Sequence, residues 1–261
     1  MRVGILAAGV GRRLNDETLP PKILLPFGGE TLLARHISIL RRCGVRRIDL
    51  VIGYRAEEIE AEIARIGAGD MVALRRNPDF TEGSILSFLA LRDAFTTGEP
   101  VVFMDGDVLY DQRLMVRLLN SAESNCFLMD RTTEEGEDPV RLCMRGDKLV
   151  DFHKRPQRSY DWWGEWIGFC RFDPEIARKV WAAAERIVAD GRREAIYEDA
   201  MRDVVVAEPP GTFGTEDITG LPWVEIDFPD DLTKAKREVF PSLLDAPSDE
   251  DLPRVASDTA R

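Results

Sequence analysis

The residues of this chain whose types and spacing best suit a chemical role follow its first apolar run. Residues 3–14 read VGILAAGVGRRL, and Pro21-Lys22 follow after a short interval. Gly9 and Gly11 allow the backbone to approach a bound triphosphate closely, so that N–H groups point at its oxygens. Arg13 and Lys22 add fixed positive charge beside those oxygens. The segment predicts a nucleoside triphosphate site, with contacts from the residues Ala7, Ala8, Gly9, Gly11 and Arg12.

A pair of carboxylates forms the second group of interest. Asp105-Gly106-Asp107 end the apolar run 101–105, which predicts a strand. In open parallel sheets, ligands bind outside the carboxyl ends of strands, where the first loop is also expected. Mg²⁺ prefers one or two carboxylates together with substrate phosphates. We therefore expect Asp105 to lie at the nucleotide and Asp107 to bind Mg²⁺, although a D-G-D sequence alone is also typical of a tight turn.

The first segment differs from two well-known glycine loops. A Rossmann fingerprint requires glycine where Leu14 stands, and a Walker loop requires Ser or Thr where Ile23 follows Lys22. From Leu6 to Pro26 the chain instead resembles the opening of the nucleotidyltransferases that activate sugar phosphates and phosphocholine, L-A-A-G-x-G-x-R-L…P-K-x-L-L/V-P. It departs from this pattern at Arg12, where a small hydroxyl residue is usual.

The resemblance implies catalytic roles and a second metal ligand. It makes Arg13 and Lys22 the catalytic cations, and in that family the second Asp of the D-x-D pair shares its metal with an Asp late in the chain. Residues 223–232, WVEIDFPDDL, resemble the corresponding E-I-D segment and identify Asp227 as the partner of Asp107. The alternative role for Asp227 is that of a capping acid at a strand–helix junction.

Residues 77–87, NPDFTEGSILS, are the expected neighbours of the nucleotide base. The related enzymes place a loop and a helix start there. Gly83 would let backbone groups reach a pyrimidine edge, and Ser84 would contact the nucleotide. Ser84 is also a good helix N-cap, a structural role that would explain it equally well.

Clustered aromatic and acidic residues suggest the acceptor. Residues 160–166 read YDWWGEW, and such clusters suit an ammonium group, at about 0.5–2 kcal/mol for each good cation–π contact. Residues 195–199, AIYED, resemble a segment of phosphocholine cytidylyltransferases, and residues 152–156, FHKRP, resemble the E-K-P of sugar nucleotidyltransferases. The expected acceptor-binding residues are Lys154, Trp163, Glu165, Trp166, Tyr197, Glu198 and Asp199. The alternative is an aromatic hairpin that packs in the core or in a dimer interface.

The elements that must position these residues alternate between strands and helices. Strands are predicted near residues 2–7, 48–53, 71–75 and 101–105, with helices over 32–43, 59–66 and 84–95 between them. This alternation is typical of βαβ units. We therefore predict an α/β, Rossmann-like mixed and mostly parallel sheet with helices on both faces, which is the nucleotidyltransferase (GT-A-like) fold implied by the resemblance.

The second half of the chain changes character. It predicts a hairpin over 140–153, a strand over 166–172, helices near 174–190 and 194–205, a strand over 223–227 and a helix starting at Pro229. We expect one domain over 1–240, with a nucleotide-binding half (1–110) and an acceptor-binding half (111–240) that contains the small hairpin. The composition of residues 241–261 predicts a disordered tail.

Composition limits the partners. The net charge of −12 argues against nucleic acid, whose binders need a basic surface. There is no apolar run long enough to span a membrane and no signal peptide pattern, and the four cysteines lack C-x-x-C spacing. These features favour a cytoplasmic protein with reduced thiols, and a homodimer is compatible with them.

Three functions remain open from the sequence. The first is a Mg²⁺-dependent cytidylyltransferase acting on phosphocholine or an aminoalkyl-phosphonate such as 2-aminoethylphosphonate. The second is a nucleotidyltransferase that uses UTP, CTP or dTTP and a sugar or cyclitol phosphate. The third is a non-catalytic nucleotide-binding regulator, against which the joint presence of Arg13, Lys22, Asp107 and Asp227 argues.

Overall fold

The computed structural model of the chain describes residues 1–14, 16, 18–132 and 139–244. Its strands are β1 (Arg2–Ala7), β2 (Pro26–Phe27), β3 (Glu30–Thr31), β4 (Ile48–Ile52), β5 (Val72–Arg76), β6 (Val101–Asp105), β7 (Val108–Tyr110), β8 (Cys126–Asp130), β9 (Arg141–Arg145), β10 (Lys148–His153), β11 (Trp162–Phe172), β12 (Gly214–Asp217) and β13 (Trp223–Glu225). Its α-helices are α1 (Leu32–Arg42), α2 (Ala56–Arg65), α3 (Ser84–Leu89), α4 (Arg92–Thr96), α5 (Gln112–Asn120), α6 (Pro174–Ala189), α7 (Tyr197–Ala207), α8 (Pro229–Lys234) and α9 (Phe240–Leu244).

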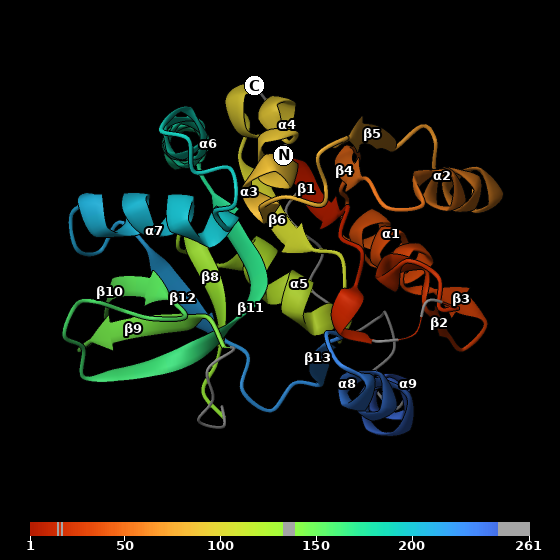
Figure 1. The fold of residues 1–261 in the computed structure, drawn as a ribbon. Coiled ribbons are helices and arrows are strands. Elements are labelled where there is room, and N and C mark those ends of the chain that lie inside the picture. Colours follow the sequence, from red (N-terminus) through yellow and green to blue (C-terminus); the bar gives the residue numbers. More distant parts are fainter. Residues whose placement is uncertain (15, 17, 133–138, 245–261) are drawn as a thin grey trace, which may run out of the picture.

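A mixed central sheet organises these elements (Figure 1). Its strand order is β10-β9-β11-β6-β1-β4-β5, and β6, β1, β4 and β5 run parallel. The long strand β11 pairs antiparallel with β6, and it also pairs with β8 and β9. The predicted α/β sheet is confirmed, with its parallel half built from the first 105 residues.

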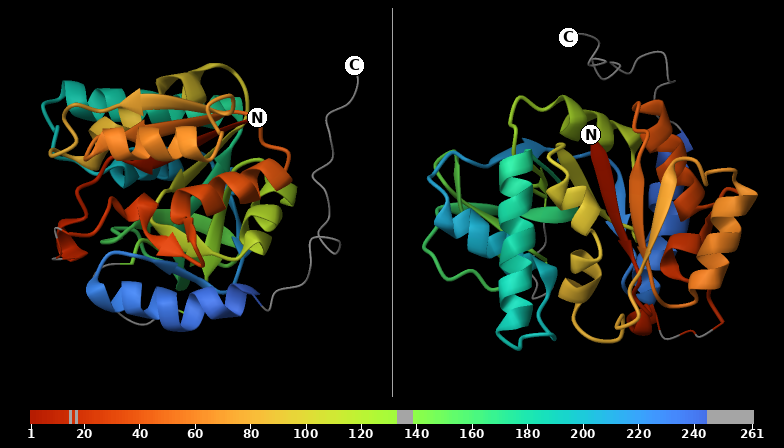
Figure 2. Two further views of the ribbon diagram at one scale, coloured as in Figure 1. Left: turned by 90° about the vertical axis from the view of Figure 1, so that its right-hand side faces the viewer. Right: turned by 90° about the horizontal axis from the view of Figure 1, so that it is seen from above.

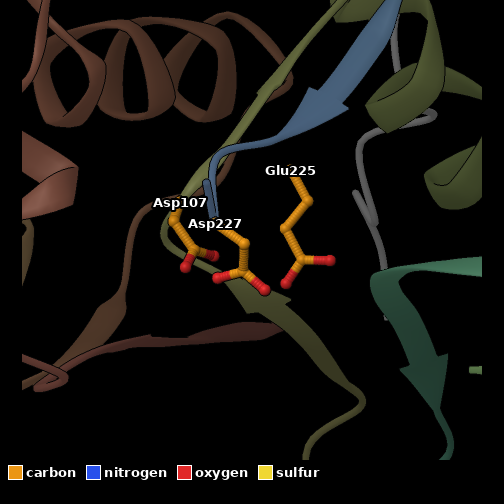
Figure 3. A group of neighbouring side chains, drawn as sticks. All are labelled: Asp107, Glu225 and Asp227. Atoms are coloured by element: carbon orange, nitrogen blue, oxygen red, sulfur yellow. The ribbon is translucent and has the colours of Figure 1, made fainter. Parts of the chain in front are cut away.

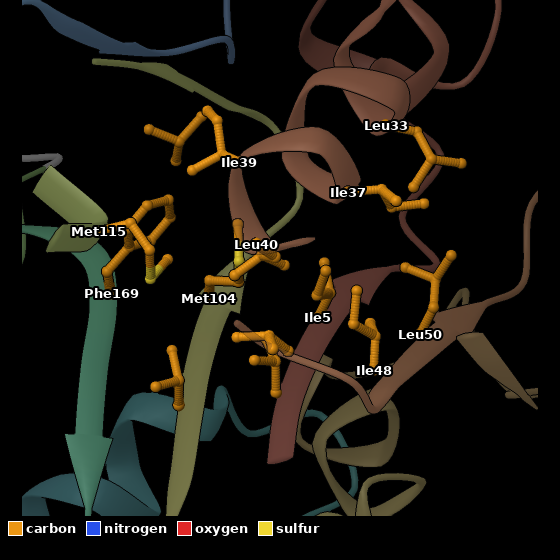
Figure 4. Close-up of a cluster of buried hydrophobic side chains, with 14 of the residues drawn as sticks. Ile5, Leu33, Ile37, Ile39, Leu40, Ile48, Leu50, Met104, Met115 and Phe169 are labelled. Atoms are coloured by element: carbon orange, nitrogen blue, oxygen red, sulfur yellow. The ribbon is translucent and has the colours of Figure 1, made fainter. Parts of the chain in front are cut away.

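Helices cover both faces of the sheet, because alternate side chains of its fully buried strands point to opposite sides. Val3 and Ile5 of β1 pack in one cluster with residues of α1, α2 and α5 (Figure 4). Val101 and Phe103 of β6 pack in the other cluster with residues of α3, α4, α6 and α7. The predicted two-faced architecture is therefore confirmed.

The C-terminal helices α8 and α9 form a separate small layer at one side of the molecule (blue in Figure 2). A π-helical segment, Ala235–Val239, joins them. Phe240 packs against Phe27, with 6.0 Å between the ring centroids, so this layer reaches back to the start of the chain. Since α9 ends at Leu244, the tail predicted from 241 does not begin there, and residues 245–261 lie outside the described residues.

Several elements differ from the sequence prediction. The helix predicted over 84–95 is divided at Ala90 and Leu91 into α3 and α4. Strand β11 begins at Trp162 and not at Trp166, so the tryptophan cluster lies inside a strand. A register shift in its pairing with β8, between Trp166 and Cys170, contains Gly168 at φ +84°, a conformation that favours glycine.

The sequence analysis did not identify β7, α5, β8 and β12. The first three follow β6 directly along the chain, and β12 pairs parallel with β8. None of the described helices is long and apolar enough to cross a membrane. All four cysteines are free thiols, and three of them are buried.

Candidate active site

The acidic turn lies directly against the end of the first strand. The Gly106 N–H donates to the Leu6 carbonyl over 2.9 Å, and a Cβ on Gly106 would lie only 2.6 Å from that oxygen. The buried His36 ring places Nε2 at 3.1 Å from the Gly106 carbonyl, so that Nε2–H donates to it. Burial lowers the pKa of His36 to about 4, which keeps this ring neutral. His36 thus fixes the turn, in line with the structural role expected of a buried histidine.

The late acidic segment reaches the same place through β13. This strand pairs antiparallel with β7, and the Ile226 N–H donates to the Asp107 carbonyl over 3.0 Å. One oxygen of Asp231 accepts the backbone N–H groups of Asp227 and Phe228, at 3.0 and 2.7 Å. Main-chain bonds therefore hold Asp227 beside Asp107, although 120 residues separate them in the sequence.

Three carboxylates converge at this point. Oxygen atoms of Asp107, Glu225 and Asp227 lie within 4.8 Å of one another and point into one space (Figure 3). Hard oxygen ligands at this spacing fit a divalent cation. The protein packed around Glu225, together with the charges of Asp107 and Asp227, raises the pKa of Glu225 to about 8. We did not predict Glu225, although the two-residue period of a strand places it on the same side as Asp227.

Two cations face these carboxylates. Lys22 Nζ lies 2.9 Å from Asp107 Oδ2 and 2.5 Å from Asp227 Oδ1, and Arg13 donates to Asp227 Oδ2 over 2.7 Å. Burial alone would lower the pKa of Lys22, but the two carboxylates raise it above its ordinary value. The structure thus brings together the four residues expected to carry the chemistry.

A cavity of about 290 Å³ opens beside this cluster. It is lined by Leu6, Ala7, Ala8, Gly9, Gly11, Lys22, Ile23, Phe80, Glu82, Ser84, Ser87, Asp105, Gly106, Asp107 and Tyr197. Six residues expected at the nucleotide are among them. Phe80, Glu82 and Ser87 belong to the segment 77–87 that was expected near the base, but they were not predicted individually. Gly11 has φ +68°, and a Cβ there would lie 3.3 Å from the Lys22 side chain. Because glycine has no Cβ, position 11 leaves room for the Lys22 side chain.

Arg12 does not line this cavity. It is exposed and borders a neighbouring cavity of about 650 Å³, which also includes Gly11, Lys22 and Tyr54. The two cavities share Gly11 and Lys22. A ligand that occupied both would pass over the glycine loop.

The expectation for Gly83 needs correction, and so does the alternative role of Ser84 as an N-cap. The Gly83 N–H donates to the Arg193 carbonyl over 3.1 Å, and a Cβ on Gly83 would clash with the backbone of residues 193–195. Gly83 therefore serves a close chain contact, and its N–H is not available to a base. Gly83, and not Ser84, is the N-cap residue of α3. Ser84 instead accepts the Tyr197 N–H at its Oγ and lines the cavity.

Tyr197 also lies elsewhere than expected. Its hydroxyl donates to Asp105 Oδ2 over 2.6 Å, and it lines the cavity of about 290 Å³ beside the glycine loop. Burial, and then the neighbouring charge of Asp107, raises the pKa of the Asp105 carboxyl well above its ordinary value. The Tyr197–Asp105 pair joins α7 to the end of β6.

A second cavity, of about 580 Å³, lies on the other side of the carboxylates. Its lining includes Asp130, Lys154, Glu165, Trp223, Glu225, Asp227, Phe228, Asp231 and Lys234. Lys154 and Glu165 are expected acceptor residues, whereas the sequence did not indicate Asp130, Trp223, Phe228 or Lys234. Burial, and then the charge of Asp130, raises the pKa of Glu165 to about 7.

The tryptophans of β11 do not line this cavity. Trp166 is only 4% exposed, packs among core aromatic rings such as Phe103 and Phe152, and donates its indole N–H to the Phe169 carbonyl. The Arg141 guanidinium lies 4.8 Å from the centre of the Trp163 ring. The structure does not support the expected ammonium contacts: Trp166 is buried, and the half-buried Trp163 already has a guanidinium over its ring and does not line this cavity.

The acids at the start of α7 are also engaged within the protein. Asp199 pairs with His153 Nε2 at 3.2 Å and with Arg192 at 2.9 Å. Glu198 is buried, and its Oε2 has no hydrogen-bond partner among the described residues. Burial raises the pKa of Glu198 to about 7. Neither residue lines the second cavity, so their expected acceptor contacts are not supported.

The segment that carries Lys154 is anchored by a buried carboxylate. Asp151 is fully buried and accepts two hydrogen bonds from Arg202 of α7, at 2.7 and 3.2 Å. Its Oδ2 also accepts the N–H groups of Gln157 and Arg158, at 2.7 and 2.8 Å. Asp151 thus holds both ends of the turn in which Lys154 lies.

We expect Asp151→Asn to destabilise the protein by about 3 kcal/mol at neutral pH, since it leaves Arg202 without its buried partner. Burial opposes ionisation of Asp151, but Arg202 and the backbone donors lower its pKa from 3.8 to about 2. Its contribution is therefore present above about pH 4 and is lost as the pH falls towards 2. Denaturant unfolding at pH 7, 4 and 3, with exposed Asp147→Asn as the control, should show the difference between variant and wild type shrinking with acid. A constant difference would contradict this assignment.

Comparison with known proteins was consistent with this geometry. Residues 3–159 match the family described as the MobA-like NTP transferase domain. The chain is 24% identical over 241 residues to the CMP-5'-(3-aminopropyl)phosphonate synthase of Streptomyces rubellomurinus. It is 30% identical over 241 residues to the bifunctional IPC transferase and DIPP synthase of Rubrobacter xylanophilus. Both matches cover 90% of this chain, but only 38% and 51% of those proteins.

Solved structures share the fold over nearly the whole chain. The inositol-1-phosphate CTP transferase from T. maritima superposes with a TM-score of 0.73 at 19% identity, covering 95% of this chain and 97% of the other. The CTP:phosphocholine cytidylyltransferase from Streptococcus pneumoniae does so with a TM-score of 0.67 at 20% identity, covering 90% and 97%. At this level of identity the likeness establishes the fold.

Proposed function

The chain belongs to the family of MobA-like NTP transferase domains and is a nucleotidyltransferase, and from this premise we propose that it is a cytidylyltransferase. The proposed reaction is transfer of CMP from CTP to phosphocholine or to an aminoalkyl-phosphonate such as 2-aminoethylphosphonate, with Mg²⁺. The observation that carries this proposal is an acidic and aromatic cavity beside the three converging carboxylates.

The charge of the second cavity supports an acceptor with a cationic amine. Its carboxylates outnumber its lysines: the acids are Asp130, Glu165, Glu225, Asp227 and Asp231, and the lysines are Lys154 and Lys234. Asp130 and Glu165 repel each other, which an ammonium group between them would relieve. Trp223 offers aromatic surface in the same cavity, and so does the exposed ring of Phe228, which also has the Arg13 guanidinium 5.5 Å from its centre. These residues replace the β11 tryptophans as our proposed amine site.

The reaction needs positioning more than proton transfer. A phosphate monoester is largely dianionic at neutral pH, so its oxygen already is a nucleophile. That oxygen attacks the α-phosphorus, a new P–O bond forms, and the bond to the departing pyrophosphate breaks. Lys22 and Arg13 would neutralise phosphate charge, and Lys154 would hold the acceptor phosphate. Asp107, Asp227 and Glu225 would hold Mg²⁺, which would supply further charge neutralisation at the α-phosphate.

The two halves of the chain divide this work in our proposal. Residues 1–110 supply nearly all of the nucleotide cavity, with Tyr197 as the contribution from the second half. The second cavity is lined by residues between Asp130 and Val239. We therefore propose a nucleotide-binding half (1–110) and an acceptor-binding half (111–240) of one domain.

The names of the relatives support CTP as the nucleotide substrate, and they also support a second class of acceptor. An aminopropylphosphonate appears in the name of one relative, and inositol 1-phosphate in the name of one structural neighbour. A sugar or cyclitol phosphate is therefore the alternative acceptor. A non-catalytic regulator is disfavoured, because Arg13, Lys22, Asp107 and Asp227 are in direct contact.

Pyrophosphate release over a matrix of substrates tests the proposal. CTP, UTP, dTTP and GTP would each be combined with phosphocholine, 2-aminoethylphosphonate, inositol 1-phosphate and glucose 1-phosphate. We expect the highest kcat/KM with CTP and one of the two amines, by about tenfold or more, since a buried carboxylate pair discriminates against an uncharged group. Faster turnover with inositol 1-phosphate or glucose 1-phosphate would establish the alternative acceptor class.

A further inference from the structure

The nucleotide cavity has one end that the reaction chemistry does not use. Gly9, Gly11 and Lys22 line one part of the cavity, and Phe80, Glu82, Ser84 and Ser87 line another part, where the segment 193–197 packs on the start of α3. Here Gly83 N–H donates to the Arg193 carbonyl, and Ile85 N–H donates to the Ala195 carbonyl, at 3.1 and 3.2 Å. Protein carbonyls therefore already satisfy these two backbone donors, so neither is available to a bound base.

The polar side chains that line this end are few. Ser84 Oγ accepts the Tyr197 N–H over 3.2 Å, and Ser87 Oγ accepts from Asn77 Nδ2 over 2.9 Å. Of the other polar side chains that line the cavity, Asp105 accepts from the Tyr197 hydroxyl and Lys22 pairs with Asp107. Glu82 lines the cavity with Ser84 and Ser87, and its side chain is 32% exposed. An ionised carboxylate can only accept hydrogen bonds.

Arg193 fixes the orientation of this carboxylate. Its Nε donates to Glu82 Oε2 over 2.7 Å and its second nitrogen donates to Oε1 over 2.9 Å, while Asp79 binds the same guanidinium at 3.1 Å. The hydrogen bonds from Arg193 lower the pKa of Glu82 and keep it ionised. A bidentate pair uses one lone pair of each oxygen, so Glu82 retains acceptor positions toward the cavity.

We infer that Glu82 is the residue that selects the base, by accepting a hydrogen bond from the exocyclic amino group of cytosine. This inference rests on the proposed function. Cytosine carries an N4 amino donor where uracil and thymine carry a carbonyl oxygen. With uracil, that oxygen would face a fixed carboxylate, and two acceptors would be left without a donor. Selection against UTP and dTTP thus follows from repulsion as well as from the bond gained with CTP.

Equilibrium binding of CTP and UTP to the full chain with Mg²⁺, without acceptor, tests this assignment. Wild type should prefer CTP by about tenfold or more, as sites built around a hydrogen bond do. Glu82→Gln should reduce the preference to within about threefold, because an amide can present either its NH₂ or its C=O group to the base. Asp79→Asn is the matched control: it removes the other carboxylate bound to Arg193, does not line the cavity, and should keep the wild-type preference.

Three results would overturn the inference. They are equal binding of CTP and UTP by wild type, an unchanged preference in Glu82→Gln, and an equal loss of preference in Asp79→Asn, which would assign the effect to Arg193. Pyrophosphate release is measured separately on the same proteins. A wild type that prefers CTP in binding yet releases no pyrophosphate with any acceptor would contradict the proposed reaction and leave the role of Glu82 intact.

Discussion

Replacing Asp107 with asparagine is expected to slow nucleotidyl transfer by at least about a hundredfold, roughly 2.7 kcal/mol in activation free energy. The substitution removes one of three carboxylates that lie within 4.8 Å of one another. It therefore weakens the binding of a divalent cation and, with it, of the triphosphate. The fold should be retained, because main-chain bonds hold the turn: Gly106 N–H to Leu6 and Ile226 N–H to the Asp107 carbonyl.

Steady-state pyrophosphate release and thermal unfolding, measured on the same preparation, separate the two effects. Asp217→Asn, at the exposed end of β12, removes a carboxylate outside the site and is the matched control. Removal of metal with EDTA should abolish wild-type activity, and excess Mg²⁺ should restore it. An Asp107→Asn protein with wild-type turnover, or activity indifferent to EDTA, would show that these carboxylates do not hold a catalytic metal.

Local sequence was sufficient to locate the nucleotide cavity. A buried parallel strand followed by a loop of small residues leaves few other interpretations of this segment. The acidic turn lies beside that loop because β6 pairs with β1, with Leu6 opposite Asp105. Asp227 could be identified only through the family resemblance. No spacing rule connects it to Asp107, and the pairing of β13 with β7 that joins them is a tertiary contact.

The acceptor site was harder to predict, because it depends on which face of a strand each side chain occupies. The tryptophans of β11 are consecutive or nearly so, and their spacing does not reveal the register shift between Trp166 and Cys170. The shift and the core rings around it bury Trp166, while arginines from neighbouring segments cover Trp162 and Trp163. The aromatic residues that lie close together in the sequence therefore do not line the cavity that we propose for the acceptor.

The sequence analysis missed other site residues for a different reason. Glu82 and Glu225 are acidic residues in segments that we had already singled out, 77–87 and the E-I-D segment, but neither had been given a role of its own. Their importance follows from what faces them: Arg193 and the nucleotide cavity for Glu82, and Asp107 and Asp227 for Glu225. Such partners become visible only when the fold brings distant segments together.

Replacement of Lys22 with alanine should change two measurements in opposite directions. Turnover should fall by about a hundredfold or more, since the lost charge acts where negative charge is concentrated. Metal affinity without nucleotide should rise, because the Lys22 ammonium now lies 2.9 and 2.5 Å from Asp107 and Asp227 and competes with any cation for them. Titration with Mn²⁺ by calorimetry, together with pyrophosphate release, measures both quantities.

Lys179→Ala supplies the control for this experiment. Lys179 also bridges two carboxylates, Glu175 and Glu208, at 2.9 and 2.7 Å, but on the surface of α6 and away from both cavities. It should change neither turnover nor metal affinity. A fall in turnover of less than about tenfold in Lys22→Ala, about 1.4 kcal/mol, would remove Lys22 from the phosphate contacts. A fall in both turnover and metal affinity would instead mean that Lys22 organises the carboxylates, since loss of a mere competitor cannot weaken metal binding.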